Sequence, residues 1–195
     1  MNEIGLTREQ AIQLVDQYIT EPVTRLHLLE TEAIMKALAK RFGEDEEVWG
    51  IIGLLHDIDW DTVKECVADH CITGQDILRK AGGTEFLIET IVSHAYGNDS
   101  IPALRDKERT TIIQHCLVSA ETLTGLIMAS ALMQPDKKLA SVKLKSLKKK
   151  FKTKSFAARC DRNLIMECEK ADIPLDEFLA IGLIALQEIG EELGY

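Results

Sequence analysis

Apolar side chains recur at helical spacing along almost the whole chain, and this pattern most limits the folds it can adopt. Thr7 and Gln10 match a capping box, and a stripe of apolar residues that includes Val15 follows them at helical spacing. Residues 107–133 and 155–171 have the same period and predict further helices. We find no convincing alternation of apolar and polar residues, and only 4 prolines could interrupt a helix. The sequence therefore predicts an all-α protein.

Length and composition favour one compact unit. The 195 residues are 46% hydrophobic and 28% charged, a balance typical of a globular protein that buries a sizeable core. We expect a helical bundle over residues 1–135 and a C-terminal helical extension over residues 136–195, packed together as one structural unit.

The expected location is the cytoplasm, and we expect no membrane partner. No secretory signal opens the chain, and no apolar run reaches the roughly 18 to 20 residues of a membrane helix. The five cysteines form no CxxC pair, so we expect most of them to be reduced, small core residues. The oligomeric state is left open.

Charge is distributed unevenly along the chain. The formal net charge is −9, yet residues 137–159 contain ten Lys or Arg and no acidic residue. The acidic remainder and the 5% aromatic content make nucleic acid an unexpected partner. The basic stretch has three interpretations: the solvated face of an amphipathic helix, a group facing a phosphate, or a surface for RNA or an acidic protein. In the second case Lys149, Lys150 and Lys154 are the candidate substrate-binding residues.

The sharpest local feature is the pair His56-Asp57, which closes the apolar run Gly-Leu-Leu-His-Asp. Adjacent helical residues point about 100° apart, but the two side chains can share one metal ion beyond the end of a helix. A helix cap or a surface pair is the alternative. His27 lies 29 residues earlier, on a preceding helix that a short turn would make an antiparallel neighbour.

Three more residues have the chemistry of ligands. His70 and His94 fall near the ends of predicted elements, and Glu121 interrupts the apolar middle of a long helix. An isolated carboxylate there is costly unless it is paired or bound to a metal ion. His115 lies six residues before Glu121 and faces the other way, so we interpret it as a structural histidine.

Over roughly residues 20–130 this series resembles the HD-domain superfamily of metal-dependent phosphohydrolases. The stretches Leu-Leu-His-Asp-Ile-Asp and Ile-Val-Ser-His are also similar to that family, and later stretches resemble a small bacterial subgroup described as predicted hydrolases. The resemblance implies an HD-domain helical bundle. It also implies a divalent metal ion (Mn, Fe, Co, Ni, Zn or Mg) held by His27, His56, Asp57 and Glu121.

Two departures from the family pattern concern the metal site. The last acidic ligand is usually Asp, whereas this chain has Glu121, and many binuclear members have His-His where this chain has His94-Ala95. A second metal site formed by Asp57, His70 and His94 therefore lacks a ligand of the family pattern. The sequence leaves open whether the chain binds one metal ion or two. Asp57, His70 and His94 are the candidate catalytic residues, because they could hold that ion, orient the substrate or exchange a proton.

The resemblance implies a phosphomonoesterase or phosphodiesterase that acts on a small phosphorylated molecule, with a nucleotide as the first expectation. The alternative is a catalytically weak regulatory module that binds a metal ion or a nucleotide. The Glu at position 121 and the missing second histidine favour that alternative.

Overall fold

The computed structural model describes residues 3–195, which form helices and short 3-10 turns with no strand among them. The all-α prediction is confirmed. The helices of the first two thirds are α1 (Arg8–Tyr18), α2 (Pro22–Phe42), α3 (Glu46–Leu55), α4 (Trp60–Val63), α5 (Ile72–Lys80), α6 (Glu85–Val92) and α7 (Ile112–Leu132). The remaining helices are α8 (Leu144–Lys152), α9 (Arg162–Met166), α10 (Leu175–Glu188) and α11 (Gly190–Leu193). The 3-10 turns are η1 (Val67–Asp69), η2 (Ser93–Ala95), η3 (Leu139–Ser141) and η4 (Glu167–Ala171).

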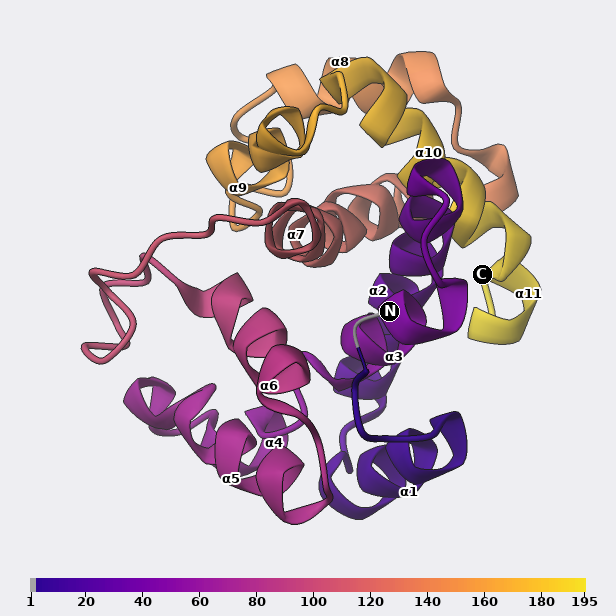
Figure 1. The fold of residues 1–195 in the computed structure, drawn as a ribbon. Helices are drawn as coiled ribbons and strands as arrows, with labels where there is room; N and C mark the ends of the chain where they lie inside the picture. The colour runs from indigo at the N-terminus through magenta and orange to yellow at the C-terminus, as the bar shows by residue number, and fades with distance from the viewer. Residues whose placement is uncertain (1–2) are drawn as a thin grey trace.

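The long helices α2 and α7 organise the fold. Helix α2 packs against α3, α7 and α10, and α7 also contacts α8, α9 and the turn η4. Figure 1 shows α4, α5 and α6 on one side of α7, and α8, α9 and α10 on the other. The C-terminal elements therefore pack on the bundle, while the division into residues 1–135 and 136–195 stays a prediction.

Local signals in the sequence set the ends of several helices. The Thr7 backbone N–H donates to Gln10 Oε1 over 2.8 Å, and the reciprocal bond completes the predicted capping box of α1. Pro22 occupies the first turn of α2, where its missing N–H is not needed. Gly43 ends α2 with a φ of 70°, a left-handed conformation that glycine adopts without strain.

Helix α7 is the most buried of the long elements. Leu117, Leu123 and Leu126 on it are fully buried. Within residues 3–195 it is the one helix long and apolar enough to span a membrane, although the sequence predicted no such segment. Because 67% of its apolar window is buried, packing inside the bundle accounts for its composition.

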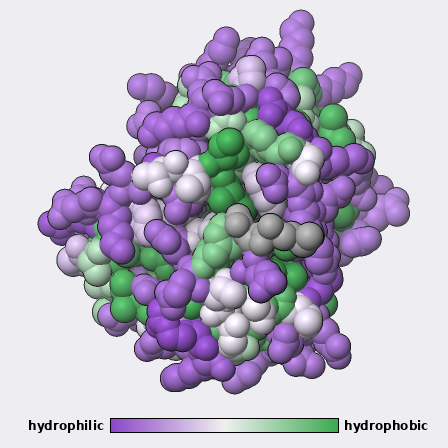
Figure 2. Space-filling view, in the orientation of Figure 1, coloured by the Kyte–Doolittle hydropathy of each residue, from purple (hydrophilic) through white to green (hydrophobic). Residues whose placement is uncertain are grey.

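Hydrophilic residues cover most of the face shown in Figure 2, and apolar residues appear there in smaller separate areas. The largest fully buried side chains include Phe178, Leu28, Ile34 and Met35. Phe178 lies on α10 and the other three lie on α2, so both parts of the chain contribute to one core.

Two predicted helices begin later than their apolar pattern indicated. Helix α7 starts at Ile112 instead of residue 107, because Thr111 and Gln114 form a capping box there. Residues 155–161 are not helical, because Asp161 caps α9 through the backbone N–H of Asn163. The Arg162 guanidinium donates to backbone carbonyls of this loop, which satisfies acceptors that a helix would otherwise pair.

Candidate metal centre

Asp57 lies among four histidines, with one carboxylate oxygen toward each pair. Its Oδ2 is 3.8 Å from His27 Nε2 and 3.6 Å from His56 Nε2. Its Oδ1 is 3.4 Å from His70 Nε2 and 3.2 Å from His94 Nε2. The two Nε2 atoms within each pair are 3.1 Å and 3.2 Å apart. The side chain of Asp57 therefore bridges two groups of nitrogen atoms.

These separations fit ligand atoms that share a cation. Two N or O ligands about 2.1 Å from one ion lie about 3.0 to 3.4 Å apart in octahedral or tetrahedral geometry. The nitrogen–nitrogen distances fall in that range, and the distances to the Asp57 oxygens lie within or slightly above it. Asp57 with His27 and His56 forms one candidate site, and Asp57 with His70 and His94 forms a second.

Backbone carbonyls hold two of the four imidazoles. His56 Nδ1 donates to the Gly53 carbonyl over 2.8 Å, and His94 Nδ1 donates to the Ile91 carbonyl over 2.7 Å. A carbonyl oxygen can only accept, so Nδ1 carries the proton in both rings. In the neutral ring the lone pair is then on Nε2, the atom that faces Asp57.

Side chains hold the other two imidazoles. His70 Nδ1 lies 2.9 Å from Asp59 Oδ1, and His27 Nδ1 lies 3.1 Å from Thr124 Oγ1. The Thr124 hydroxyl donates its own proton to the Glu121 carbonyl over 2.7 Å, so it accepts from His27. Every ligand histidine thus has an outer partner at Nδ1, the arrangement that orients imidazoles around metal ions.

Close helix packing brings the first pair of histidines together. A Cβ atom at Gly53 would lie 3.0 Å from backbone atoms of Glu32, so only glycine lets α3 approach α2 this closely. His56 follows α3 as its C-cap and His27 lies on α2. Their ring centroids are 4.9 Å apart.

The two aspartates that follow Asp57 support the site without facing its centre. Besides His70, Asp59 accepts from the backbone N–H groups of Cys71 at 2.8 Å and Gly74 at 2.7 Å. Asp61 accepts from Thr24 Oγ1 and from two backbone N–H groups at the start of α2. Asp59 thereby fixes His70 and the first turn of α5, whereas Asp61 fixes the start of the helix that carries His27.

Substitution of Asp59 by Ala is expected to weaken metal binding by about 10- to 100-fold, the usual loss when an outer partner of a ligand is removed. Equilibrium dialysis with a divalent cation measures the change. Asp76 on α5 is exposed, and its Asn variant serves as the control. An unchanged affinity in Asp59→Ala would show that His70 needs no orientation by Asp59.

The electrostatics of the cluster favour positive charge around Asp57. Burial lowers the pKa of His56 to about 3, so its imidazole is neutral at pH 7. Burial opposes ionisation of Asp57, but the neighbouring imidazoles outweigh it and hold the Asp57 pKa well below its usual value. Burial also disfavours the cationic forms of His70 and His94. Asp59 beside His70 and Cys71 beside His94 stabilise the cationic forms by more than burial destabilises them. The pKa of His70 rises to about 10, and that of His94 lies well above its ordinary value. A divalent cation would replace these protons.

Glu121 lies near these residues, since the charges of His94, His27 and Asp57 act on its pKa. Its Oε1 accepts from Thr122 Oγ1 over 2.5 Å, and no hydrogen bond or ion pair within residues 3–195 joins it to His27, His56 or Asp57. Burial raises the pKa of Glu121, although the charges of His94 and His27 act in the opposite direction. The structure thus brings together three of the four predicted ligands, and the role of Glu121 as the fourth stays a prediction.

The three candidate lysines have different surroundings. Lys150 Nζ lies 3.3 Å from the Ser130 carbonyl and 4.8 Å from the centroid of the Phe156 ring, so its ammonium has partners already. Lys149 is exposed, and Lys154 is exposed at the edge of a hollow. No hydrogen bond, ion pair or cation–π pair within the described part of the chain joins any of the three to the histidine cluster. Their role in substrate binding stays a prediction.

A separate ionic cluster supports the turn that carries His94. His115 Nδ1 lies 2.8 Å from Glu167 Oε2, so His115 has the structural role predicted for it. The Arg109 guanidinium donates to both Glu167 oxygens, over 2.6 and 2.9 Å. It also donates to carbonyls in and beside η2, including that of Ser93 at 2.7 Å. Arg109 therefore ties η2 to η4 of the C-terminal extension.

This cluster predicts a pH-dependent stability. Burial opposes ionisation of Glu167, but its hydrogen bonds to Arg109 and His115 outweigh it and lower its pKa from 4.5 to about 2. A depressed pKa adds stability above about pH 4.5, which is lost as the pH falls toward 2. We expect Glu167→Gln to cost about 2 kcal/mol at pH 7, after allowance for solvent screening, and less at pH 3.5. Urea unfolding at both values measures this. An equal loss of stability at pH 7 and pH 3.5 would exclude an ionic contribution of Glu167.

Comparison with known proteins identifies the family. The model of the HD domain family matches residues 24–126, a span that covers more than half of the chain and all six predicted ligands. No solved structure matches the chain. Together with four histidines that converge on the aspartate of a His-Asp pair, the match shows that the chain belongs to the HD domain family, a superfamily of metal-dependent phosphohydrolases.

Proposed function

We propose that this protein is a metal-dependent phosphohydrolase that acts on a small phosphorylated molecule, with nucleotides as the first class to test. One observation carries the proposal: four Nε2 atoms converge on the two oxygens of Asp57, while an outer partner holds each Nδ1. Nitrogen lone pairs that face one another at about 3 Å repel unless protons or a cation lie between them. The donor set suits divalent ions of the Mn to Zn series.

The site of His27, His56 and Asp57 fits the cation used in hydrolysis. It supplies three protein ligands, which leaves positions for water and substrate, as in catalytic metal sites. The His27 side chain is 26% exposed, against 8% for both His70 and His94, so solvent and substrate reach this side of Asp57 more readily. A bound cation there lowers the pKa of water and polarises the phosphoryl group. His27 and His56 hold the cation, and Asp57 adds the negative charge that retains it.

The position of Glu121 favours a second candidate function. Its Oε1 lies 2.5 Å from Thr122 Oγ1, and no hydrogen bond or ion pair in the described residues joins it to His27 or His56. If Glu121 is needed to complete the site and stays in that position, the protein is a regulatory module that binds a metal ion or a nucleotide without turnover.

A basic loop next to α7 is the proposed phosphate-binding surface. Cys160 Sγ packs so close to α7 that a Cβ at Gly125, one turn after Glu121, would lie 2.8 Å from it. Lys154 and Arg159 line the same hollow as Cys160. Of the candidates Lys149, Lys150 and Lys154, the last lines this hollow, and we propose it as the residue that meets a substrate phosphate.

Lys154→Ala is expected to raise KM for a phosphorylated substrate by about 5-fold at low ionic strength, which corresponds to about 1 kcal/mol of lost attraction. The effect should shrink at high salt, because screening acts over about 8 Å at 0.15 M. Lys145 on α8 is also exposed, and Lys145→Ala is the control. Equal KM values for both variants at every salt concentration would place Lys154 outside the substrate site.

A phosphate-release screen tests the proposed function. The protein is loaded with Mn²⁺, Co²⁺ or Zn²⁺ and incubated with nucleotides, phosphodiesters and sugar phosphates. Chromatography detects both inorganic phosphate and phosphomonoester products, because cleavage of a diester releases a monoester instead of inorganic phosphate. We expect metal-dependent release from at least one class, lost in His56→Ala and retained in His115→Asn, whose amide can still donate to Glu167. Binding of a nucleotide without release in any metal form would favour the regulatory module.

A further inference from the structure

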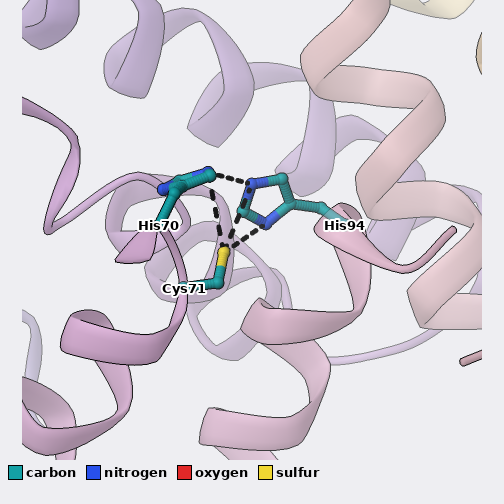
Figure 3. Close-up of side chains that lie close together, drawn as sticks. All are labelled: His70, Cys71 and His94. Atoms are coloured by element: carbon teal, nitrogen blue, oxygen red, sulfur yellow. Dashed lines mark hydrogen bonds between the residues drawn. The ribbon is translucent and has the colours of Figure 1, made fainter. Parts of the chain in front are cut away.

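Cys71 is the one cysteine whose sulfur faces the histidine cluster in the described residues. It follows His70 directly and is 2% exposed. Figure 3 shows its sulfur directed between the rings of His70 and His94. The Sγ atom lies 3.6 Å from His70 Nε2 and 3.8 Å from His94 Nε2. These are the same two nitrogens that approach Oδ1 of Asp57.

The sulfur completes a set of four possible ligand atoms. A tetrahedral cation with Zn–S of about 2.3 Å and Zn–N of about 2.0 to 2.1 Å places sulfur and nitrogen about 3.5 Å apart. The same ion places its N and O ligands about 3.3 Å from one another. The structure has His70 and His94 Nε2 3.2 Å apart, and they lie 3.4 and 3.2 Å from Asp57 Oδ1. These separations are close to those expected around one cation, and the ligand atoms of His70, Cys71 and His94 all lie within 4.8 Å of one another.

The backbone holds the sulfur in this position. Cys71 has a φ of 63°, a left-handed conformation that residues with a Cβ rarely adopt. Its N–H donates to Asp59 Oδ2 over 2.8 Å, while Asp59 Oδ1 holds His70. One carboxylate therefore orients two adjacent ligand candidates.

We infer that Asp57, His70, Cys71 and His94 form a closed four-coordinate site for a thiophilic divalent cation such as Zn²⁺, with the Cys71 thiolate as a ligand. The inference deepens the proposed function and rests on it in one respect, since Asp57 also serves the first site. On binding, the S–H bond of Cys71 breaks, its proton leaves to solvent, and a sulfur–metal bond forms.

The two sites then differ in chemistry. The site of His27 and His56 has no sulfur and only three protein ligands, so it remains open to water. The site of Cys71 has four protein ligands and is closed, as in structural zinc sites. Thiolate favours Zn²⁺ and Co²⁺ over Mg²⁺ and Mn²⁺, so the closed site should retain the first two selectively.

Cobalt spectroscopy tests the inference independently of hydrolysis. The metal-free full chain is titrated with Co²⁺, and the near-ultraviolet charge-transfer band of a cobalt–thiolate bond is recorded. We expect the band in the native protein and in Cys66→Ser, because Cys66 is exposed and outside the cluster. We expect no such band in Cys71→Ser. A band of equal intensity in Cys71→Ser would overturn the inference.

Zinc protection of the native protein supplies a measurement that needs no variant. Bound Zn²⁺ should slow alkylation of Cys71, mapped by mass spectrometry, by at least about 100-fold relative to Mg²⁺. Metal-free protein is first labelled under conditions in which Cys71 reacts, because the thiol is 2% exposed. Equal labelling with both ions under those conditions would overturn the inference. A cobalt–thiolate band without phosphate release would leave the closed site standing and reject the hydrolase. Phosphate release without the cobalt–thiolate band would reject the closed site and leave the hydrolase proposal standing.

Discussion

Replacement of Asp57 by Asn is expected to lower kcat/KM for the phosphorylated substrate by about 1,000-fold or more. Asp57 lies within 3.8 Å of both pairs of histidines, so the change removes the negative charge shared by the two cation sites and replaces one carboxylate oxygen by an amide nitrogen. A loss of about 4 kcal/mol of transition-state stabilisation corresponds to that factor, which is within the range expected for a metal ion acting on a phosphoryl group. Steady-state kinetics at saturating metal concentration provide the measurement.

Asp99→Asn is the matched control for this substitution. Its side chain is 95% exposed and lies outside the cluster, so activity should stay within about twofold of the native value. Residual activity of Asp57→Asn above about a tenth of native would mean that catalysis does not depend on the bridging carboxylate.

Metal removal is expected to lower Tm by about 8 to 16 °C. A ligand present at 1,000 times its Kd stabilises the native state by about 4 kcal/mol, and each kcal/mol moves Tm by about 2 to 4 °C in a chain of this length. Without a cation, protons on the imidazoles beside Asp57 balance its carboxylate, and no metal ion joins the elements that carry the four histidines. Calorimetry of chelated protein, before and after addition of Mn²⁺ or Zn²⁺, measures the shift.

The control for this experiment is the double variant His27→Ala and His94→Ala, which removes one nitrogen ligand from each site. Its Tm should change little on chelation or metal addition. A native protein that keeps its Tm after metal analysis confirms complete removal would contradict a stabilising metal centre.

The sequence predicted helices well where apolar spacing and capping residues agree, as at Thr7 and Gln10 for α1. It was less accurate where side chains end or delay a helix. Residues 107–110 fit the apolar period, but the capping box at Thr111 starts α7 later. Residues 155–161 also fit it, yet Arg162 binds the loop carbonyls and Asp161 caps the next helix. Such bonds depend on residue geometry that periodicity does not contain.

The spacing of the histidines indicated a cluster, but it did not indicate the residues that orient the histidine side chains. Thr124 reaches His27 across 97 positions of sequence, and Arg109 acts on the turn of His94 through its carbonyls. Neither has a local motif. Asp59 and Cys71 had a usable signal, because Asp59 lies two residues after Asp57 and Cys71 directly follows His70. Cys71 was not identified as a ligand because the cysteines were interpreted as core residues. Burial is expected of both a core thiol and a metal ligand.

The pairing of Arg109 with Glu167 has a consequence for the evolution of this chain. The region matched by the HD family ends at residue 126, so Glu167 lies outside it while Arg109 and His94 lie inside. The turn that carries the candidate ligand His94 is thus held, through Arg109, by an acidic residue outside the matched region. Genetic exchange of the C-terminal segment with that of a relative would leave the Arg109 guanidinium, whose side chain is 8% exposed, without its carboxylate unless the incoming segment supplied one. The two parts of the chain are therefore expected to be inherited together.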